Sequence, residues 1–117
     1  MTPSGRRLLD LQVSRQGDAA VMKISGSVAM ADAERLRTSL EDLAAQRVPV
    51  IALDLSEMDF ISSAGLGAVI FGHLKCRHHH GQIKLVNPTP QVRQLLETTR
   101  LNKLFGVYDS IDQALPG

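Results

Sequence analysis

Residues 50–67, VIALDLSEMDFISSAGLG, decide the fold of this chain. They open with an unbroken apolar run, Val50 to Leu53, which is typical of a strand that is buried on both faces in the middle of a parallel sheet. A loop is expected over residues 56–60. Ser62 and Ser63 then stand at the start of a helix with an apolar stripe. The stretch therefore predicts the strand–loop–helix unit of an α/β fold.

The residues before this stretch predict a hairpin and a helix. Apolar and polar residues alternate over residues 9–13 and 20–24, which predicts two strands joined by a turn at residues 16–18. Gly26 is expected to end the second strand. Apolar residues then recur at helical spacing over residues 31–47, and charged residues occupy the opposite face.

The residues after the stretch continue the alternation of strands and helices. The helix that begins at the serines is expected to end at Gly81, and residues 83–86 predict the next strand. Residues 92–99 predict a third helix, residues 101–107 a short packed segment or strand, and residues 109–115 a last short helix. We therefore expect an α/β fold with a mixed, mostly parallel sheet of about four to five strands and about four helices.

Composition limits the class of protein. A chain of 117 residues with 44% hydrophobic residues can bury one core, so a single domain over residues 1–117 is expected, with residues 1–6 flexible. A net charge of +1 argues against a strongly basic nucleic-acid binder. The single cysteine fits a reducing compartment, and no apolar run approaches the ~20 residues that span a bilayer. The predicted location is the cytoplasm, with no nucleic-acid or membrane partner.

The two serines allow two interpretations. A serine that caps a helix contributes about 1 kcal/mol over alanine, because it accepts a hydrogen bond from a free backbone N–H group. A helix N-terminus also stabilises an anion, and this one follows the carboxyl end of a strand, where α/β folds usually place their sites. Ser62 and Ser63 are thus candidates both for capping and for phosphorylation.

The same residues do not form a known catalytic or cofactor motif. A nucleophile elbow needs Gly-x-Ser-x-Gly, and around Ser63 only the second glycine, Gly65, is present. Gly65 and Gly67 do not make a dinucleotide fingerprint either, because Ile70 occupies the third glycine position. We therefore predict no enzyme activity and no cofactor.

A cluster of histidines and one cysteine lies near the end of this helix. His73, Cys76 and His80 fall on roughly one helical face, and zinc accepts such ligands. A solvated helix end, where cations complement the helix dipole, is the preferred interpretation. No metal site is predicted, and Cys76 is expected at the surface of the helix.

Residues 54–67 resemble the signature of STAS domains, the anti-sigma-factor antagonist fold. The likeness covers nearly the whole chain, including Gly26, residues 85–88 and residues 104–110. It implies an antagonist that binds an anti-sigma factor, itself a serine kinase of the histidine-kinase-like ATPase fold, and so frees a sigma factor. Phosphorylation of one serine at the start of the second helix stops binding, and a PP2C-type phosphatase reverses it. The matching serine is Ser63.

The resemblance also implies a partner-binding surface around this serine. Its residues are Gly26, Ser27, Ala29, Met30, Asp59, Ser62, Ser63, Ala64, Gly65 and Gly67. Two positions depart from the family: Ser62 replaces an acidic residue, and Ala29 replaces a common aspartate. Both remove negative charge near Ser63, and Ser62 becomes a second possible acceptor of phosphate. A constitutive STAS subunit of a signalling scaffold, a lipid-transport complex or a secretion-control system is the alternative.

Overall fold

The computed structural model describes residues 7–115, so the expected flexibility of residues 1–6 lies outside the described residues. The strands are β1 (Asp10–Gln16), β2 (Ala19–Val28), β3 (Val50–Asp54), β4 (Met58–Ile61), β5 (Gln82–Val86) and β6 (Gly106–Tyr108). The helices are α1 (Ala33–Ala45), α2 (Ser63–Arg77), α3 (Pro90–Thr98) and α4 (Ile111–Ala114), with 3₁₀ turns at Met30–Asp32 and Leu101–Lys103.

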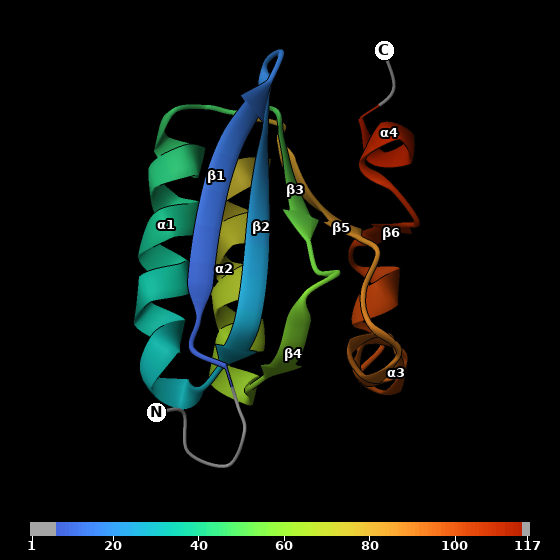
Figure 1. The fold of residues 1–117 in the computed structure, drawn as a ribbon. Coiled ribbons are helices and arrows are strands. Elements are labelled where there is room, and N and C mark those ends of the chain that lie inside the picture. Colours follow the sequence, from blue (N-terminus) through green and yellow to red (C-terminus); the bar gives the residue numbers. More distant parts are fainter. Residues whose placement is uncertain (1–6, 116–117) are drawn as a thin grey trace.

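The strands form a six-stranded mixed sheet (Figure 1). Its order is β1-β2-β3-β5-β6, and β4 pairs with β2 beside this path. Among the strand pairs of the described residues, only the β1–β2 hairpin is antiparallel, and the others are parallel. The predicted fold class, a mixed and mostly parallel sheet with flanking helices, is confirmed.

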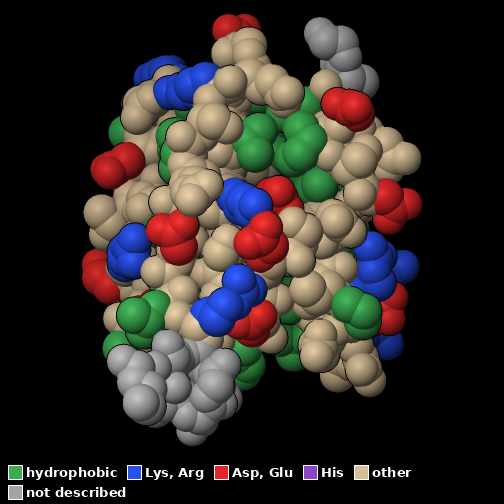
Figure 2. Space-filling model, in the orientation of Figure 1, with side chains coloured by type: hydrophobic (Ala, Val, Ile, Leu, Met, Phe, Trp, Pro, Cys, Tyr) green, Lys and Arg blue, Asp and Glu red, His purple; other side chains and the backbone are tan. Residues whose placement is uncertain are grey.

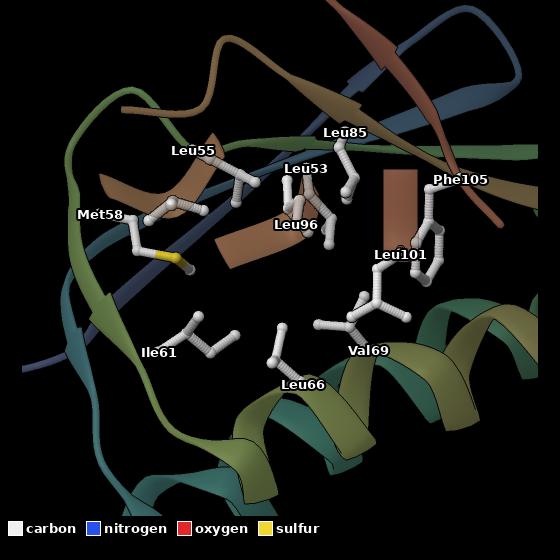
Figure 3. Close-up of a pocket in the computed structure, with 11 residues that line it drawn as sticks. Leu53, Leu55, Met58, Ile61, Leu66, Val69, Leu85, Leu96, Leu101 and Phe105 are labelled. Atoms are coloured by element: carbon white, nitrogen blue, oxygen red, sulfur yellow. The ribbon is translucent and has the colours of Figure 1, made fainter. Parts of the chain in front are cut away.

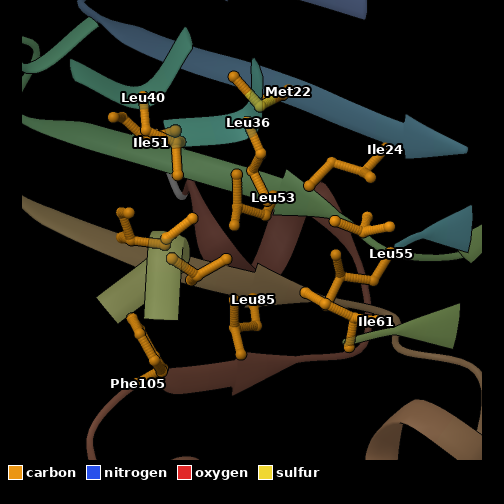
Figure 4. Packing of buried hydrophobic residues seen from close by; sticks show 14 of the residues in the cluster. Met22, Ile24, Leu36, Leu40, Ile51, Leu53, Leu55, Ile61, Leu85 and Phe105 are labelled. Carbon is orange, nitrogen blue, oxygen red and sulfur yellow. The ribbon is translucent and has the colours of Figure 1, made fainter. Parts of the chain in front are cut away.

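One face of the sheet carries the main core, beneath α1, α2 and α3. Met22 and Ile24 of β2, Leu36 and Leu40 of α1, and Leu53 of β3 belong to one buried cluster (Figure 4). Each such side chain contributes about 1.5–3 kcal/mol relative to leaving it in water. This core holds α2, and hence its N-terminus, in a fixed position on the sheet.

The opposite face of the sheet is covered only in part. Ala114 of α4 packs on Ala52 and Val86, which alternate along their strands with the side chains of the main core. Lys84 also donates a hydrogen bond to the Ala114 carbonyl at 2.8 Å, so α4 is attached to β5. The β1–β2 half of this face is polar, as expected for an antiparallel pair with one solvated side.

The prediction of a loop over residues 56–60 is wrong, because β4 begins at Met58 and adds a strand to the sheet. Met58 and Ile61 are buried, whereas Asp59 and Phe60 are exposed. This pattern does not alternate, because the pairing of β4 with β2 shifts register between Gly26 and Ser27. A bulge of this kind removes the period of two from which a strand is predicted.

The prediction that Gly26 ends the second strand is also wrong, since β2 continues to Val28. Gly26 has φ +83°, and a Cβ atom at this position would lie 2.2 Å from the Leu8 carbonyl oxygen. Its N–H donates to the Glu57 carbonyl at 3.0 Å. Glycine therefore lets the chain bend inside a continuing strand rather than ending it.

The histidine–cysteine cluster is a solvated helix end only in part: His78 and His80 are exposed, whereas His73 and Cys76 are buried. Cys76 is fully buried, so its predicted surface position is wrong, and burial raises the pKa of its thiol. His73 is buried as well, and its Nδ1 accepts a hydrogen bond from the Ile83 N–H at 3.1 Å. Within residues 7–115 no group of three or more histidine, cysteine, aspartate or glutamate side chains could hold a metal ion.

None of the helices within residues 7–115 is both long enough and apolar enough to cross a membrane.

Candidate functional site

Ser62 is the N-cap of α2. Its backbone is extended, and its Oγ accepts a hydrogen bond from the Gly65 N–H at 3.1 Å. Its own N–H donates to the Val28 carbonyl at 2.8 Å, which ties the cap to the end of β2. The side chain is buried, with 7% of the residue exposed. The capping interpretation is confirmed for Ser62, and its hydroxyl is both bonded and enclosed.

Ser63 is the first residue of α2 and is exposed. At this position it lies beside backbone N–H groups that have no partner within the helix. These groups and the helix dipole favour a negative charge on a side chain here. Ser63 therefore combines access from solvent with an environment that tolerates a phosphate.

Gly65 determines how closely α2 approaches the sheet. A Cβ atom on Gly65 would lie 2.7 Å from Ile61 Cγ1 and 2.8 Å from Val28 Cγ1, so no side chain fits. The first turn of α2 consequently packs its backbone directly on β2 and β4. Ser63 is thereby held at the carboxyl ends of these two strands, and Ala64 beside it is partly exposed.

The end of β2 supplies the next part of the predicted surface. Gly26 and Ser27 are buried there, and the Ser27 hydroxyl has no hydrogen-bond partner among residues 7–115. Ala29 is partly exposed, and its N–H donates to Asp32 Oδ2 at 3.0 Å. Met30 is 73% exposed, which is unusual for a large apolar side chain.

Asp59 of β4 is exposed and forms a two-pronged ion pair with Arg7. Arg7 Nε lies 3.0 Å from Asp59 Oδ2, and Arg7 Nη2 lies 3.1 Å from Oδ1. The hydrogen bond from Arg7 lowers the pKa of the Asp59 carboxyl. Arg7 also donates to the Glu57 carbonyl, and the Glu57 carboxylate pairs with Lys23 at 2.6 Å. Figure 2 shows basic and acidic side chains clustered together in the middle of this face.

Arg7 and two apolar side chains were not predicted from the sequence. Leu8 is 80% exposed and Phe60 is 38% exposed. Phe60 is the register partner of Ser27, and the Leu8 carbonyl lies against Gly26. Leu8 and Phe60 thus lie beside the last residues of β2. Their shared position follows from strand register, which no local pattern of residues encodes.

The residues of the predicted partner-binding surface lie at one end of the molecule, but some of them are exposed and others are buried. Those that reach solvent fully are Met30, Asp59, Ser63 and Gly67. Ala29 and Ala64 are partly exposed, and the enclosed members are Gly26, Ser27, Ser62 and Gly65. The enclosed residues shape the surface from beneath, and only the others can touch a partner without a change of structure.

An apolar cavity of about 20 Å³ lies between the sheet and helices α2 and α3 (Figure 3). Only apolar side chains line it, among them Leu66 and Val69 of α2 and Leu96 of α3. A cavity of this kind offers no polar partner to an ordered water molecule. It is a packing defect below the site rather than a candidate binding site.

The model of the STAS domain family matches residues 10–114. This chain belongs to the STAS domain family. It is 32% identical over 91 residues to BtrV of Bordetella bronchiseptica, which is named as an anti-sigma factor antagonist; the alignment covers 78% of each chain. The crystal structure of an anti-sigma factor antagonist from Mycobacterium paratuberculosis superposes with a TM-score of 0.83 at 26% identity, covering 92% of this chain and 91% of that one.

A third likeness, to the phosphorylated form of the Bacillus cell fate determinant SpoIIAA, concerns the fold alone. Its TM-score is 0.71 at 19% identity, and it covers 90% of this chain and 96% of that one. The STAS fold of this chain thus agrees with the fold expected from residues 54–67.

Proposed function

We propose that this STAS domain is an anti-sigma-factor antagonist that binds an anti-sigma factor while Ser63 is unmodified and releases it when Ser63 is phosphorylated. The observation that carries the proposal is the difference between the two serines. Ser62 is buried and bonded to Gly65, whereas Ser63 is exposed on the first turn of α2. A kinase can reach the hydroxyl of Ser63 without disturbing the cap.

The relatives support this proposal. BtrV and the Mycobacterium paratuberculosis protein both carry the name of anti-sigma factor antagonists. SpoIIAA, which shares the fold, has been solved in a phosphorylated form. The proposed partners are a serine-kinase anti-sigma factor of the histidine-kinase-like ATPase fold and a PP2C-type phosphatase. The proposal also places the protein in the cytoplasm, where such partners act.

The physical chemistry of the site fits a switch without a change of fold. Phosphorylation adds about −1.5 to −2 charge at pH 7, and the N-terminus of α2 can hold that charge. A partner packed over Ser63 would have to remove water from the dianion, which is costly without a matching cation. A loss of about 1.4 kcal/mol already lowers affinity tenfold.

The contact surface would consist of the exposed residues around Ser63. Leu8, Met30 and Phe60 offer apolar area, and the Arg7–Asp59 pair forms part of a polar rim. An apolar centre with a polar rim is the usual anatomy of a protein interface.

Mass mapping after incubation with a kinase tests the assignment of the switch. Each serine-kinase anti-sigma factor encoded in the same genome is purified and incubated with this protein and ATP. We expect one phosphate on the peptide that contains Ser63, and its loss in Ser63→Ala. Labelling that persists in Ser63→Ala but disappears in Ser62→Ala would move the switch to Ser62. An absence of both labelling and binding with every kinase would refute the proposed function.

A constitutive STAS subunit is the second candidate, and the departures at Ser62 and Ala29 favour it. Both positions lack the carboxylates that are common in the family, so a kinase that reads those charges would recognise this surface less well. A Ser63→Asp variant that binds its partner as tightly as the unmodified protein would favour this candidate.

A further inference from the structure

A hollow lined by basic side chains lies between the C-terminal ends of α1 and α2. These two helices lie side by side (Figure 1), and the lining comes from their last turns and from the loops that follow them. The hollow has a volume of about 520 Å³, which is within the range of small-molecule sites. The residues around it are Glu41, Ala44, Ala45, Arg47, Lys75, His78 and His79.

The cations of this hollow have no negative partner. Arg47 and Lys75 form no ion pair with any carboxylate within residues 7–115. The ammonium of Lys75 lies 5.2 Å from the centre of the Phe71 ring, a contact that neutralises no charge. The carboxylate of Glu41 is already paired with Arg37, whose Nε lies 3.5 Å from Glu41 Oε1. The hollow therefore has an excess of positive charge.

Two imidazole rings add hydrogen-bond donors to these charges. His79 Nε2 lies 3.1 Å from the Val48 carbonyl oxygen, which can only accept, so Nε2 carries a proton and the ring is held in place. His78 beside it is exposed. The Cys76 carbonyl at the end of α2 accepts hydrogen bonds from the N–H groups of His79 and Gly81, at 3.1 and 2.8 Å. An anion in the hollow would therefore meet donors as well as positive charge.

We infer that the hollow binds an anion that contains a short chain of linked phosphates. The donors come from the last turn of α2, from the loop after it and from the loop before β3, so the ligand needs acceptor oxygens on several sides. A carboxylate has only two oxygens, whereas linked phosphates present several, and a guanidinium can bind two of them at once. No phenylalanine or tyrosine is among the described residues around the hollow, so it offers no phenyl ring on which the base of a nucleotide could stack.

The inference is independent of the proposed function. Lys75 follows Ser63 by twelve residues in α2, a distance of about 18 Å along the helix. Exposed charges at this separation are largely screened in physiological salt. Failure to bind an anti-sigma factor would therefore refute the proposed function and leave this inference standing.

Titration with sodium tripolyphosphate in about 0.15 M salt, followed by two-dimensional amide NMR, tests the inference. We expect saturable shifts that are confined to the amides of residues 44–48 and 75–81. Arg47→Gly and Lys75→Gln should each weaken binding at least fivefold. Glu41→Gln should strengthen it at least twofold, because it removes the negative charge at the hollow. ATP should bind no more tightly than tripolyphosphate.

Arg100→Gly is the matched control. Arg47 follows the C-cap of α1 and Arg100 follows that of α3, and both have a left-handed backbone, with φ of 59° and 62°. Glycine adopts this conformation without strain, so neither replacement should lower the melting temperature. Arg100 is not among the described residues around the hollow, so Arg100→Gly should leave the affinity for tripolyphosphate unchanged.

Three results would overturn the inference. Equal weakening in Arg47→Gly and Arg100→Gly would mean that the anion binds exposed cations in general. Shifts that spread over the whole chain, or that do not saturate at millimolar tripolyphosphate, would mean the same. ATP that binds at least tenfold more tightly than tripolyphosphate would show that contacts with the base, and not with the phosphates, determine the affinity.

Discussion

The hydroxyl of Ser62 accepts a hydrogen bond from the backbone N–H of Gly65 at 3.1 Å, one turn into α2. The same Gly65 leaves no room for a side chain between α2 and the strands β2 and β4. The hydrogen bond of the cap and the close packing on the sheet therefore both involve Gly65. Together they fix the first turn of α2 and leave the neighbouring Ser63 on the surface.

The cap predicts different effects of alanine at the two serines. Ser62→Ala should lower the free energy of unfolding by about 1 kcal/mol, because the Gly65 N–H loses its buried acceptor. Ser63→Ala should change it by no more than about 0.5 kcal/mol, as is usual for an exposed position. Urea unfolding of both variants measures the difference, and equal destabilisation would contradict the assignment of the cap.

Replacement of Gly26 should lower the free energy of unfolding more than replacement of either serine. Gly26→Ala introduces a Cβ atom 2.2 Å from the Leu8 carbonyl oxygen at φ +83°, so we expect a loss of about 2 kcal/mol or more. Gly17→Ala is the matched control, because Gly17 also has a positive φ, +62°, but open space around it. Gly17→Ala should lower the free energy of unfolding by only about 1 kcal/mol. Similar losses in both variants would mean that conformation alone, and not the contact with Leu8, requires glycine at position 26.

The ion pair between Arg7 and Asp59 predicts that the pKa of the Asp59 carboxyl depends on the Arg7 guanidinium. The hydrogen bond from Arg7 lowers the pKa of Asp59, so Arg7→Ala should raise that pKa towards its ordinary value. The pair therefore stabilises the folded state above the unfolded pKa of Asp59, and this contribution is lost as the pH falls through the folded pKa. NMR titration of the Asp59 carboxyl measures the shift, with Arg100→Ala as a distant control. An unchanged Asp59 pKa in Arg7→Ala would show that the pair does not persist in solution.

His73 predicts acid sensitivity of the fold. Burial, with a smaller contribution from the charge of Arg77, lowers the pKa of His73 below its ordinary value of 6.5. A proton on Nδ1 would also break its hydrogen bond with the Ile83 N–H. The unfolded chain thus binds this proton more readily, so stability should decrease as the pH falls below about 6.5 towards the folded pKa.

Unfolding experiments at pH 7.5 and pH 5.5 test this prediction. His73→Asn, which keeps an acceptor near the Ile83 N–H, should lose less stability between the two pH values than the unmodified protein. His78→Asn changes an exposed histidine and should leave the pH dependence as it is. A pH dependence that is unchanged in His73→Asn would contradict the assignment to His73.

The central part of the fold could be predicted because its signals are local. The apolar run Val50–Leu53 predicts a buried strand, and helical spacing predicts α1 and α2 from their apolar positions. β4 could not be predicted, because Met58 and Ile61 are its buried residues and do not alternate. Its pairing with β2 depends on a distant strand, and sequence periodicity contains no information about that partner.

The surface placement of Cys76 and of the neighbouring His73 was wrong because residue type misleads there. His73 and Cys76 lie at helical spacing from Val69 and point into the core, while Leu74 is 54% exposed. The helical period alone would have placed these residues together, but the chemistry of histidine and cysteine suggested a surface.

The candidate site was predictable only where it follows the chain. Ser63 stands at a helix start that the sequence itself marks, and Gly65 lies two residues later. Arg7 and Leu8 reach the site only through contacts between distant strands, as with the bond from the Ser27 N–H to the Arg7 carbonyl at 3.1 Å. Tertiary contacts of this kind leave no mark on the local pattern of residues.

The most direct test of the account is the affinity of the anti-sigma factor for this protein with and without a phosphate on Ser63. Titration calorimetry on the unmodified protein and on the homogeneous Ser63-phosphorylated protein measures it. We predict at least tenfold weaker binding of the phosphorylated protein, a difference of about 1.4 kcal/mol or more, with an unchanged circular dichroism spectrum. Equal affinities of the two forms would contradict the central claim that Ser63 is the switch.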